Sequence, residues 1–168
     1  MVQITKMRLP TNAEWNRLVD VVGEGDNVLH WSNMYSWCQD TDPFYPLKRM
    51  VRGRLLARYW GGRSISRRHA NVGFRPAFEF SGNRSLADGT VTTADTLYMD
   101  GSPVKVPVNP TKDGDIPDYI PGAKLEFREA IDDAAYQVQA IKVGNVLIAD
   151  QVLLKNISWG DLHMQGIC

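Results

Sequence analysis

Scarce cysteine and the absence of common catalytic motifs restrict the functions open to this 168-residue chain. Its two cysteines, Cys38 and Cys168, lie far apart without a CxxC pair, which excludes a disulfide framework and a zinc ribbon. There is no GxSxG, HExxH or P-loop sequence. The three histidines, His30, His69 and His163, are isolated from one another. We therefore expect a protein that is not an enzyme and that holds no metal and no cofactor.

Long hydrophobic runs and net charge are also lacking. No run approaches the roughly 18 to 20 apolar residues that cross a bilayer, and the first ten residues, MVQITKMRLP, contain no apolar signal-peptide core. We expect the chain to fold in a reducing cytoplasm without membrane insertion. Its 19 basic and 19 acidic residues cancel, and its 43% apolar residues are enough to bury a core.

The stretch MRLPTNAEWNRLVDVVG, residues 7 to 23, predicts a capped helix. Thr11 and Glu14 form a capping box, in which each side chain accepts a hydrogen bond from the other residue's backbone amide. Gly23 is placed to end the helix in a left-handed turn. Apolar residues repeat between these ends at helical spacing and predict one buried stripe: Trp15, Leu18, Val19 and Val22.

The next segments predict irregular structure followed by strands. Residues 30–46 are rich in aromatic side chains but have no periodicity, so we expect an ordered irregular segment wrapped over a small core. A short strand is expected near residues 48–51. In VGFRPAFEF, residues 72–80, alternating positions predict a half-buried strand, and Pro76 assigns it to an edge or a bulge.

A change of composition near residue 85 indicates a second domain. The sequence beyond it contains short β-segments joined by turns, ending with ISWGDL and including a Gly144-Asn145 turn. The acidic loop 109–122 lacks the spacing of a calcium loop and is interpreted as a connector. The predicted class is therefore α+β, with one domain over residues 1–84 and a small β-rich domain over residues 85–168.

The zero net charge hides an uneven distribution. No acidic residue lies between Asp42 and Glu79, and the rest of the chain carries a charge of −9. A basic segment of this kind suits either nucleic acid or an acidic protein surface. The segment contains nine basic residues: Lys48, Arg49, Arg52, Arg54, Arg58, Arg63, Arg67, Arg68 and Arg75.

Four segments within residues 7–80 resemble, in their order, the formylglycine-generating-enzyme branch of the C-type-lectin-like fold: RLPTNAEW, MVRGRLLARYW, RSISRR and VGFRP. Their short spacing is similar to that of the reduced versions in phage proteins and in variable proteins of diversity-generating retroelements. The resemblance implies one or two helices, short twisted antiparallel strands and long ordered loops. Together with the predicted helix start, it assigns structural roles to six residues: Thr11, Glu14, Trp15, Arg52, Gly73 and Arg75.

The metal-dependent activities of this fold are not expected here. The sulfatase-activating enzymes need a cysteine pair for copper near the end of the fold, and the chain has no cysteine between Gln39 and Ile167. Calcium-dependent lectins use an EPN or QPD triplet together with WND. This chain has neither EPN nor QPD, and WSN at residues 31–33 is its only counterpart of WND. The sulfoxide-synthase relatives need an HxxxHxE helix, which is absent. The resemblance thus implies a non-catalytic scaffold.

The resemblance also places a binding surface just before the GFRP segment, where retroelement-diversified relatives display solvent-facing residues on a fixed scaffold. Aromatic, arginine, serine and asparagine side chains are typical of protein-binding patches. Two alternatives stay open, namely that Trp60 belongs to the core and that the loop arginines are merely solvated. The predicted surface consists of eight residues: Tyr59, Trp60, Arg63, Ser64, Arg67, Arg68, His69 and Asn71.

These observations support two functions. The first is a phage- or prophage-type accessory protein that binds a protein ligand, while its C-terminal domain docks to a virion component or to its own copies. The second is a nucleic-acid-directed or host-defence-inhibiting protein that uses the basic segment 48–75. The first hypothesis places the chain in a virion after its synthesis in the cytoplasm.

Overall fold

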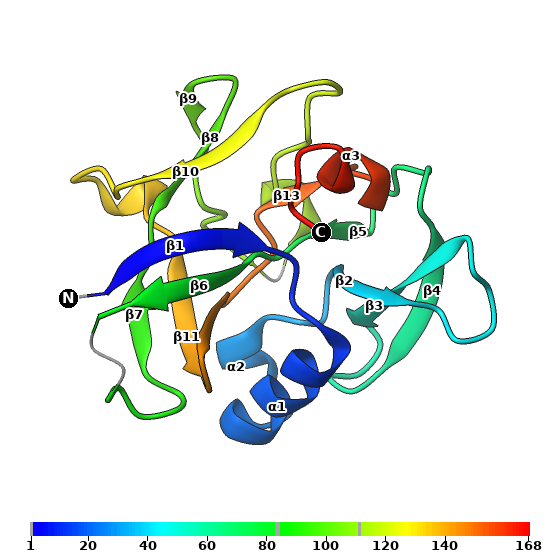
Figure 1. Ribbon diagram of the computed structural model, residues 1–168, viewed down its shortest axis with the longest axis horizontal. Coiled ribbons are helices and arrows are strands. Elements are labelled where there is room, and N and C mark those ends of the chain that lie inside the picture. Colours follow the sequence, from blue (N-terminus) through cyan, green and yellow to red (C-terminus); the bar gives the residue numbers. More distant parts are fainter. Residues whose placement is uncertain (1, 83–84, 111) are drawn as a thin grey trace.

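The protein belongs to the α+β class, as predicted. The computed structural model describes residues 2–82, 85–110 and 112–168, and within these it contains three short α-helices and thirteen strands in three sheets (Figure 1). The helices and 3₁₀ turns are α1 (Asn12–Val22), α2 (Asp26–Leu29), α3 (Trp159–His163), η1 (Asp113–Asp115) and η2 (Ala134–Tyr136).

The first sheet, sheet A, is antiparallel and combines strands from both halves of the chain. In spatial order it consists of β1 (Gln3–Arg8), β6 (Ala77–Ser81), β12 (Val146–Ala149), β11 (Gln139–Val143) and β7 (Val91–Thr93). Strand β6 pairs with β1 on one side and with β12 on the other. The segments predicted as separate domains, 1–84 and 85–168, therefore share one continuous sheet.

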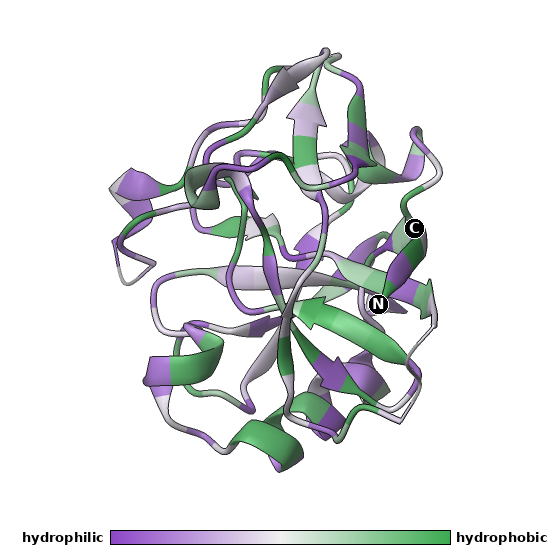
Figure 2. Cartoon of the chain, turned by 90° about the vertical axis from the view of Figure 1, so that its left-hand side faces the viewer, coloured by the Kyte–Doolittle hydropathy of each residue, from purple (hydrophilic) through white to green (hydrophobic). Residues whose placement is uncertain are grey.

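Both halves also share a hydrophobic core. Phe78 on β6 belongs to the same buried cluster as Leu97 and Leu147, and its ring meets that of Phe127 edge-on at 4.8 Å. Figure 2 shows hydrophobic strands crossing the middle of the molecule and mixed hydropathy along the helices. The boundary predicted at residue 85 does not divide two cores, because the apolar face of β6 is covered by side chains from the C-terminal half.

The second sheet, sheet B, carries the candidate site. In spatial order it consists of β13 (Leu154–Lys155), β5 (Val72–Phe74), β2 (Tyr35–Thr41), β3 (Lys48–Gly53) and β4 (Trp60–Ser64). Strands β2 and β5 are parallel, whereas the other neighbours are antiparallel. Among the described residues no strand pairs with the outer side of β4, so β4 is an edge strand.

The third sheet, sheet C, lies above the other two in Figure 1. It consists of β10 (Leu125–Arg128), β8 (Thr96–Met99) and β9 (Ser102–Pro103). Each neighbouring pair is antiparallel.

Helix α1 confirms the predicted start. Both hydrogen bonds of the Thr11–Glu14 capping box are present. Of the predicted stripe, Trp15, Leu18 and Val19 are buried, whereas Val22 is only partly buried. The helix ends at Gly23 as predicted, but with φ 86° and ψ 177°, which is not the left-handed helical conformation that we expected. Its positive φ still favours glycine, because L side chains rarely adopt it.

Three local predictions are wrong. Residues 30–46 are not wholly irregular, because Tyr35–Thr41 forms β2, a central strand whose aromatic side chains are buried by neighbours distant in sequence. Residues 72–80 do not form one strand, since the chain leaves sheet B at Phe74 and enters sheet A after Pro76. The final segment ISWGDL contributes to a helix, because Ser158 and Asp161 form a second capping box that starts α3.

Candidate functional site

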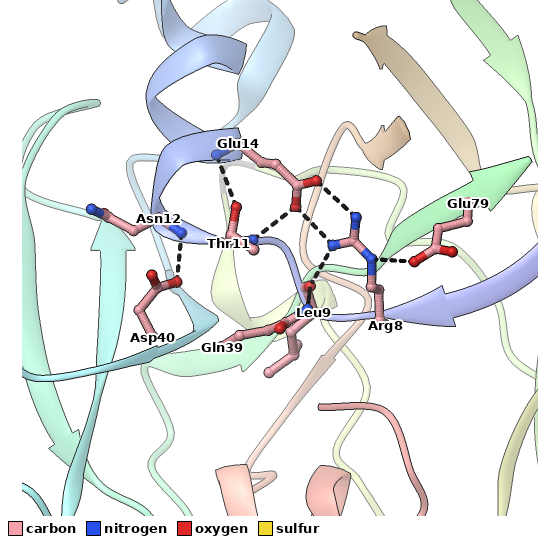
Figure 3. A network of polar contacts seen from close by, with 8 residues as sticks. All are labelled: Arg8, Leu9, Thr11, Asn12, Glu14, Gln39, Asp40 and Glu79. Atoms are coloured by element: carbon pink, nitrogen blue, oxygen red, sulfur yellow. Dashed lines mark hydrogen bonds and ion pairs between the residues drawn. The ribbon is translucent and has the colours of Figure 1, made fainter. Parts of the chain in front are cut away.

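The start of α1 is tied to sheet A by a network of charged side chains (Figure 3). The guanidinium of Arg8 donates to both carboxylate oxygens of Glu14, each at 2.7 Å, and to Glu79 at 2.8 Å. Glu14 also accepts from the backbone amide of Thr11. Burial alone would raise the pKa of Glu14, but the hydrogen bonds from Arg8 and Thr11 outweigh it and leave this pKa below its ordinary value.

Arg52 fixes the approach to strand β4. It is 3% exposed, and its guanidinium donates to the side-chain oxygens of Asn12 and Asn16 on α1, at 2.6 and 2.8 Å. The same group donates to the backbone carbonyls of Arg58 and Tyr59, both at 3.1 Å. It therefore links β3, α1 and the loop that enters β4, using donors in the fixed planar geometry that arginine provides.

Arg75 holds the junction between sheets A and B. It is fully buried, and it donates to the hydroxyl of Ser36 at 3.0 Å and to the carbonyls of Ala149 and His30 at 3.0 and 3.2 Å. Asp150 stands nearby and forms no ion pair with any described residue. Burial raises the pKa of its carboxyl to about 6, although the charge of Arg75 acts in the opposite direction. Arg75 thus serves the fold, with backbone and hydroxyl acceptors for its donors.

Gly73 allows two strands to approach closely. A Cβ atom at this position would lie 2.2 Å from a methyl carbon of Val152 and 2.5 Å from the carbonyl oxygen of Leu154. These distances are far below van der Waals contact, so a side chain would push β13 away from β5. The structure thus gives a steric reason for a glycine in the GFR segment.

The predicted surface lies on and beyond β4, but its residues do not form one patch. Successive side chains of a strand point to opposite faces of its sheet. Trp60 pairs across the ladder with Arg52, whose side chain reaches α1, so Trp60 and Ser64 belong to the α1 face. Arg63 belongs to the opposite face, where its guanidinium carbon lies 4.7 Å above the ring of Tyr35. The predicted residues therefore flank β4 on both sides.

Three large aromatic side chains on the α1 face are exposed, and together with Leu47, which is exposed and adjacent in sequence, we call them the aromatic patch: Phe44 (73%), Tyr45 (57%), Leu47 (73%) and Trp60 (40%). The rings of Phe44 and Trp60 stack with centroids 6.3 Å apart and an interplanar angle of 15°. Lys48 places its ammonium 4.5 Å from the centroid of Tyr45. Trp60 is consequently neither a core residue nor an isolated surface residue.

The loop before β3 reaches Trp60 because Gly62 leaves room for it. The carboxylate of Asp42 accepts from the amide of Phe44 at 2.8 Å and lies directly over β4. A Cβ atom at Gly62 would be only 1.9 Å from this carboxylate. The second glycine of the Gly61-Gly62 pair is therefore needed for the loop to fold over the strand and to place Phe44 against Trp60.

On the opposite face, two arginine side chains lie over one tyrosine ring. Arg63 and Arg54 lie above Tyr35, with guanidinium carbons 4.7 and 5.6 Å from its centroid, and the ring of Tyr59 is 5.9 Å away. Burial and then the charges of Arg67 and Arg63 lower the pKa of His69. We call this group the arginine cluster: Arg54, Arg63, Arg67 and His69.

Other members of the predicted surface have structural partners. Arg68 donates twice to Asp161 on α3, at 2.9 and 2.8 Å. The backbone carbonyl of Asn71 accepts from the amide of Tyr35 at 2.8 Å, and the hydroxyl of Ser64 lies 3.2 Å from that of Ser66. Arg68 therefore fastens the loop after β4 to α3, and its guanidinium is already paired.

The aromatic patch and Arg54 were not among the predicted binding residues. Phe44 and Tyr45 were expected to wrap over the core, yet each is more than half exposed, and no role was predicted for the exposed Leu47. Arg54 was counted only as part of the basic segment. The available signal was the pair Pro43 and Pro46 around Phe44, since prolines on both sides of a short aromatic run are typical of an exposed turn.

The remaining titratable groups lie apart from one another or have structural partners in the described part of the chain. Within residues 2–82, 85–110 and 112–168, no group of three or more His, Cys, Asp or Glu side chains could hold a metal ion. Burial raises the pKa of the Cys38 thiol to about 12, so this cysteine is protonated at neutral pH. In the acidic loop, Asp118 pairs with Lys155 at 2.8 Å and accepts from Asn156.

Comparisons with protein families, curated proteins and solved structures found no match to this chain. Among the helices of the described residues, none is long and apolar enough to cross a membrane.

Proposed function

We propose that this chain is a non-catalytic binding protein whose protein ligand contacts the surface on both sides of β4. The observation that carries the proposal is the aromatic patch, in which Phe44 is 73% exposed and stacks on Trp60. Clustered aromatic side chains supply large contact area at low entropic cost and are enriched at protein interfaces. A contiguous exposed apolar patch on a soluble domain is typical of an interaction site.

The proposal extends to the scaffold, which we infer to be a reduced C-type-lectin-like domain of the phage type. The residues that carry the resemblance form mutually supporting contacts: Arg8 binds Glu14, Arg52 reaches α1, and Arg75 reaches β2. These contacts leave the loops around β4 free to present side chains. A phage-type role predicts that antibodies against the chain label purified virions; labelling confined to the cell lysate would contradict it.

A second candidate function is supported by charge. Among the described residues, seven of the nine cations of the segment form no ion pair. Arg52 and Arg75 are buried, which leaves five that are not: Lys48, Arg49, Arg54, Arg63 and Arg67. Such a group suits phosphates. Against this stand the exposed aliphatic Leu47, which offers no stacking surface to a base, and the charge of −9 on the rest of the chain. We therefore place nucleic acid second.

A photo-crosslinking amino acid at position 44 tests the first proposal. We expect covalent adducts with one protein in cells that produce the chain, and we expect these adducts to fall at least about tenfold when Trp60→Ala is added, because the stacked ring is removed. Leu55→Ala with Leu56→Ala is the matched control, since both leucines are exposed in the loop before β4. Equal adducts in all variants, or adducts with nucleic acid, would contradict the proposal.

A further inference from the structure

We infer that the ligand is an extended acidic segment of the partner protein, which pairs with the open edge of β4 and seats carboxylates on the arginine cluster. The inference rests on the proposed function and specifies the chemistry of the partner. Three observations support it, namely an unpaired strand edge, a set of arginines without counterions on one face, and an apolar patch on the other face.

The edge of β4 has backbone groups available for a further strand. Hydrogen bonds from the Gly53 amide to the Tyr59 carbonyl and from the Ile65 amide to the Leu47 carbonyl turn the odd-numbered residues of this hairpin toward β3. In an antiparallel ladder the alternate residues point outward. The amides of Trp60, Gly62 and Ser64 and the carbonyl of Trp60 therefore face the edge. The carbonyl of Gly62 already accepts from the Arg63 guanidinium at 2.8 Å, and that of Ser64 from the Arg67 amide at 3.5 Å. Edge strands of this kind are templates for β-augmentation.

The arginine cluster is held in place before any ligand arrives. Tyr35 is only 4% exposed, and its ring supports both Arg63 and Arg54. Arg54 has φ 62°, and its amide donates to the carbonyl of Trp31 at 2.6 Å, so its backbone is fixed in the left-handed region. Guanidinium groups stacked on a buried ring lose little further freedom on binding, which favours affinity.

The cluster lacks the counterions that neighbouring arginines have. Arg58 pairs with Asp20 at 2.7 Å and Arg68 with Asp161 at 2.8 Å, whereas no carboxylate of the described residues forms an ion pair with Arg54, Arg63 or Arg67. Like charges gathered at one place create a positive potential that an incoming carboxylate relieves.

Further groups border Arg54. This residue also lines a hollow of about 510 Å³ whose walls include Lys112, Asp113 and Asp115. The two aspartates form no ion pair with the cluster in the described part of the chain. Because like charges repel, these aspartates favour seating the acidic segment near Arg63 rather than near Arg54.

The two faces of β4 define the side-chain pattern of the ligand. A strand added at the edge alternates its side chains between the faces of the sheet. Residues on the α1 face would meet Trp60 and Phe44, while those on the opposite face would meet Arg63. The ligand should therefore alternate apolar and acidic residues. Aliphatic side chains of the ligand would contact the aromatic patch, and a polynucleotide carries no aliphatic side chains. The pattern therefore favours a protein ligand.

Defined hexapeptides test this pattern by calorimetry on the full chain. We expect a blocked peptide of alternating leucine and glutamate to bind at least about tenfold more tightly than its leucine–glutamine counterpart. Arg63→Gln should weaken binding of the acidic peptide at least about tenfold. The control is Lys105→Gln, because Lys105 is an exposed cation outside the basic segment 48–75, and it should change the affinity by no more than about twofold. Equal binding of the two peptides, or no effect of Arg63→Gln, would overturn the inference.

Backbone methylation of the acidic peptide isolates the strand pairing. Amides of the leucines and of the glutamates lie on opposite edges of an extended peptide, so methylation of one set should abolish binding while methylation of the other set leaves it intact. Full binding by both methylated peptides would overturn the pairing. Tighter binding of a thymidine hexanucleotide than of the acidic peptide would assign the cluster to phosphate instead.

These assays separate the inference from the proposed function. In one outcome, crosslinking from position 44 depends on Trp60, but the leucine–glutamate and leucine–glutamine peptides bind equally. This outcome would refute the acidic strand and leave the proposed function standing. In the opposite outcome, the acidic peptide binds more tightly than its glutamine counterpart, but crosslinking from position 44 does not change with Trp60→Ala. This outcome would refute the aromatic contact and leave the carboxylate site standing.

Discussion

Arg75 and Arg63 belong to the same acid-free segment but occupy opposite environments. Arg75 is fully buried, and its donors reach Ser36, Ala149 and His30. Arg63 lies on a tyrosine ring at the edge of a sheet, and its guanidinium donates to the carbonyl of Gly62. The difference teaches that the local density of arginines says little about their role. The distinguishing feature is whether the surrounding chain already supplies the acceptors.

The largest effect is expected at the buried end of this comparison. Arg75→Ala should lower the free energy of unfolding by about 3 kcal/mol, because it leaves a cavity and removes the donor from three buried acceptors. Urea denaturation at neutral pH measures the change. Arg75→Met is the control for volume and should lose less, since an apolar side chain fills the cavity. A loss from Arg75→Ala no greater than that from Arg63→Ala would refute the structural role.

An intermediate effect is expected where the network is charged but partly exposed. Glu14→Gln keeps an acceptor for the Thr11 amide but removes the charge beside Arg8, so it should lower stability by about 1 kcal/mol at pH 7. The pKa of Glu14 is depressed in the folded protein. Its contribution is therefore present above the unfolded pKa of about 4.3 and is lost as the pH falls through the lower folded pKa.

Denaturation curves of the wild type and of Glu14→Gln should accordingly converge in acid, below about pH 4. Glu79→Gln provides the matched control, because Glu79 binds the same guanidinium through one hydrogen bond at 2.8 Å and is 45% exposed. It should lower stability less than Glu14→Gln. A difference between wild type and Glu14→Gln that is independent of pH would show that the charge is not its source.

The smallest effect is expected at the open end of the comparison. Arg63→Gln combined with Arg67→Gln should change the free energy of unfolding by no more than about 0.5 kcal/mol, because neither guanidinium has an ion-pair partner among the described residues. Thermal and urea unfolding measure it directly. A loss comparable with that of Glu14→Gln would show that these arginines serve the fold rather than a ligand.

The sequence alone was sufficient for the features that depend on neighbours along the chain. The Thr11–Glu14 capping box, the stripe of Trp15 and the Gly144-Asn145 turn each require only residues within a few positions of one another. The α+β class also followed, since it depends on the periodicity of short segments.

Only the tertiary structure decided which segments share a sheet and which side chains stay exposed. Strand β6 pairs with both β1 and β12, which removes the predicted boundary at residue 85, and no local pattern encodes that pairing. Phe44 and Tyr35 stand nine positions apart in one aromatic stretch, yet one is exposed and the other is buried. Burial depends on the strands and loops that the whole chain brings against a residue, and these contacts join positions too far apart for periodicity to report.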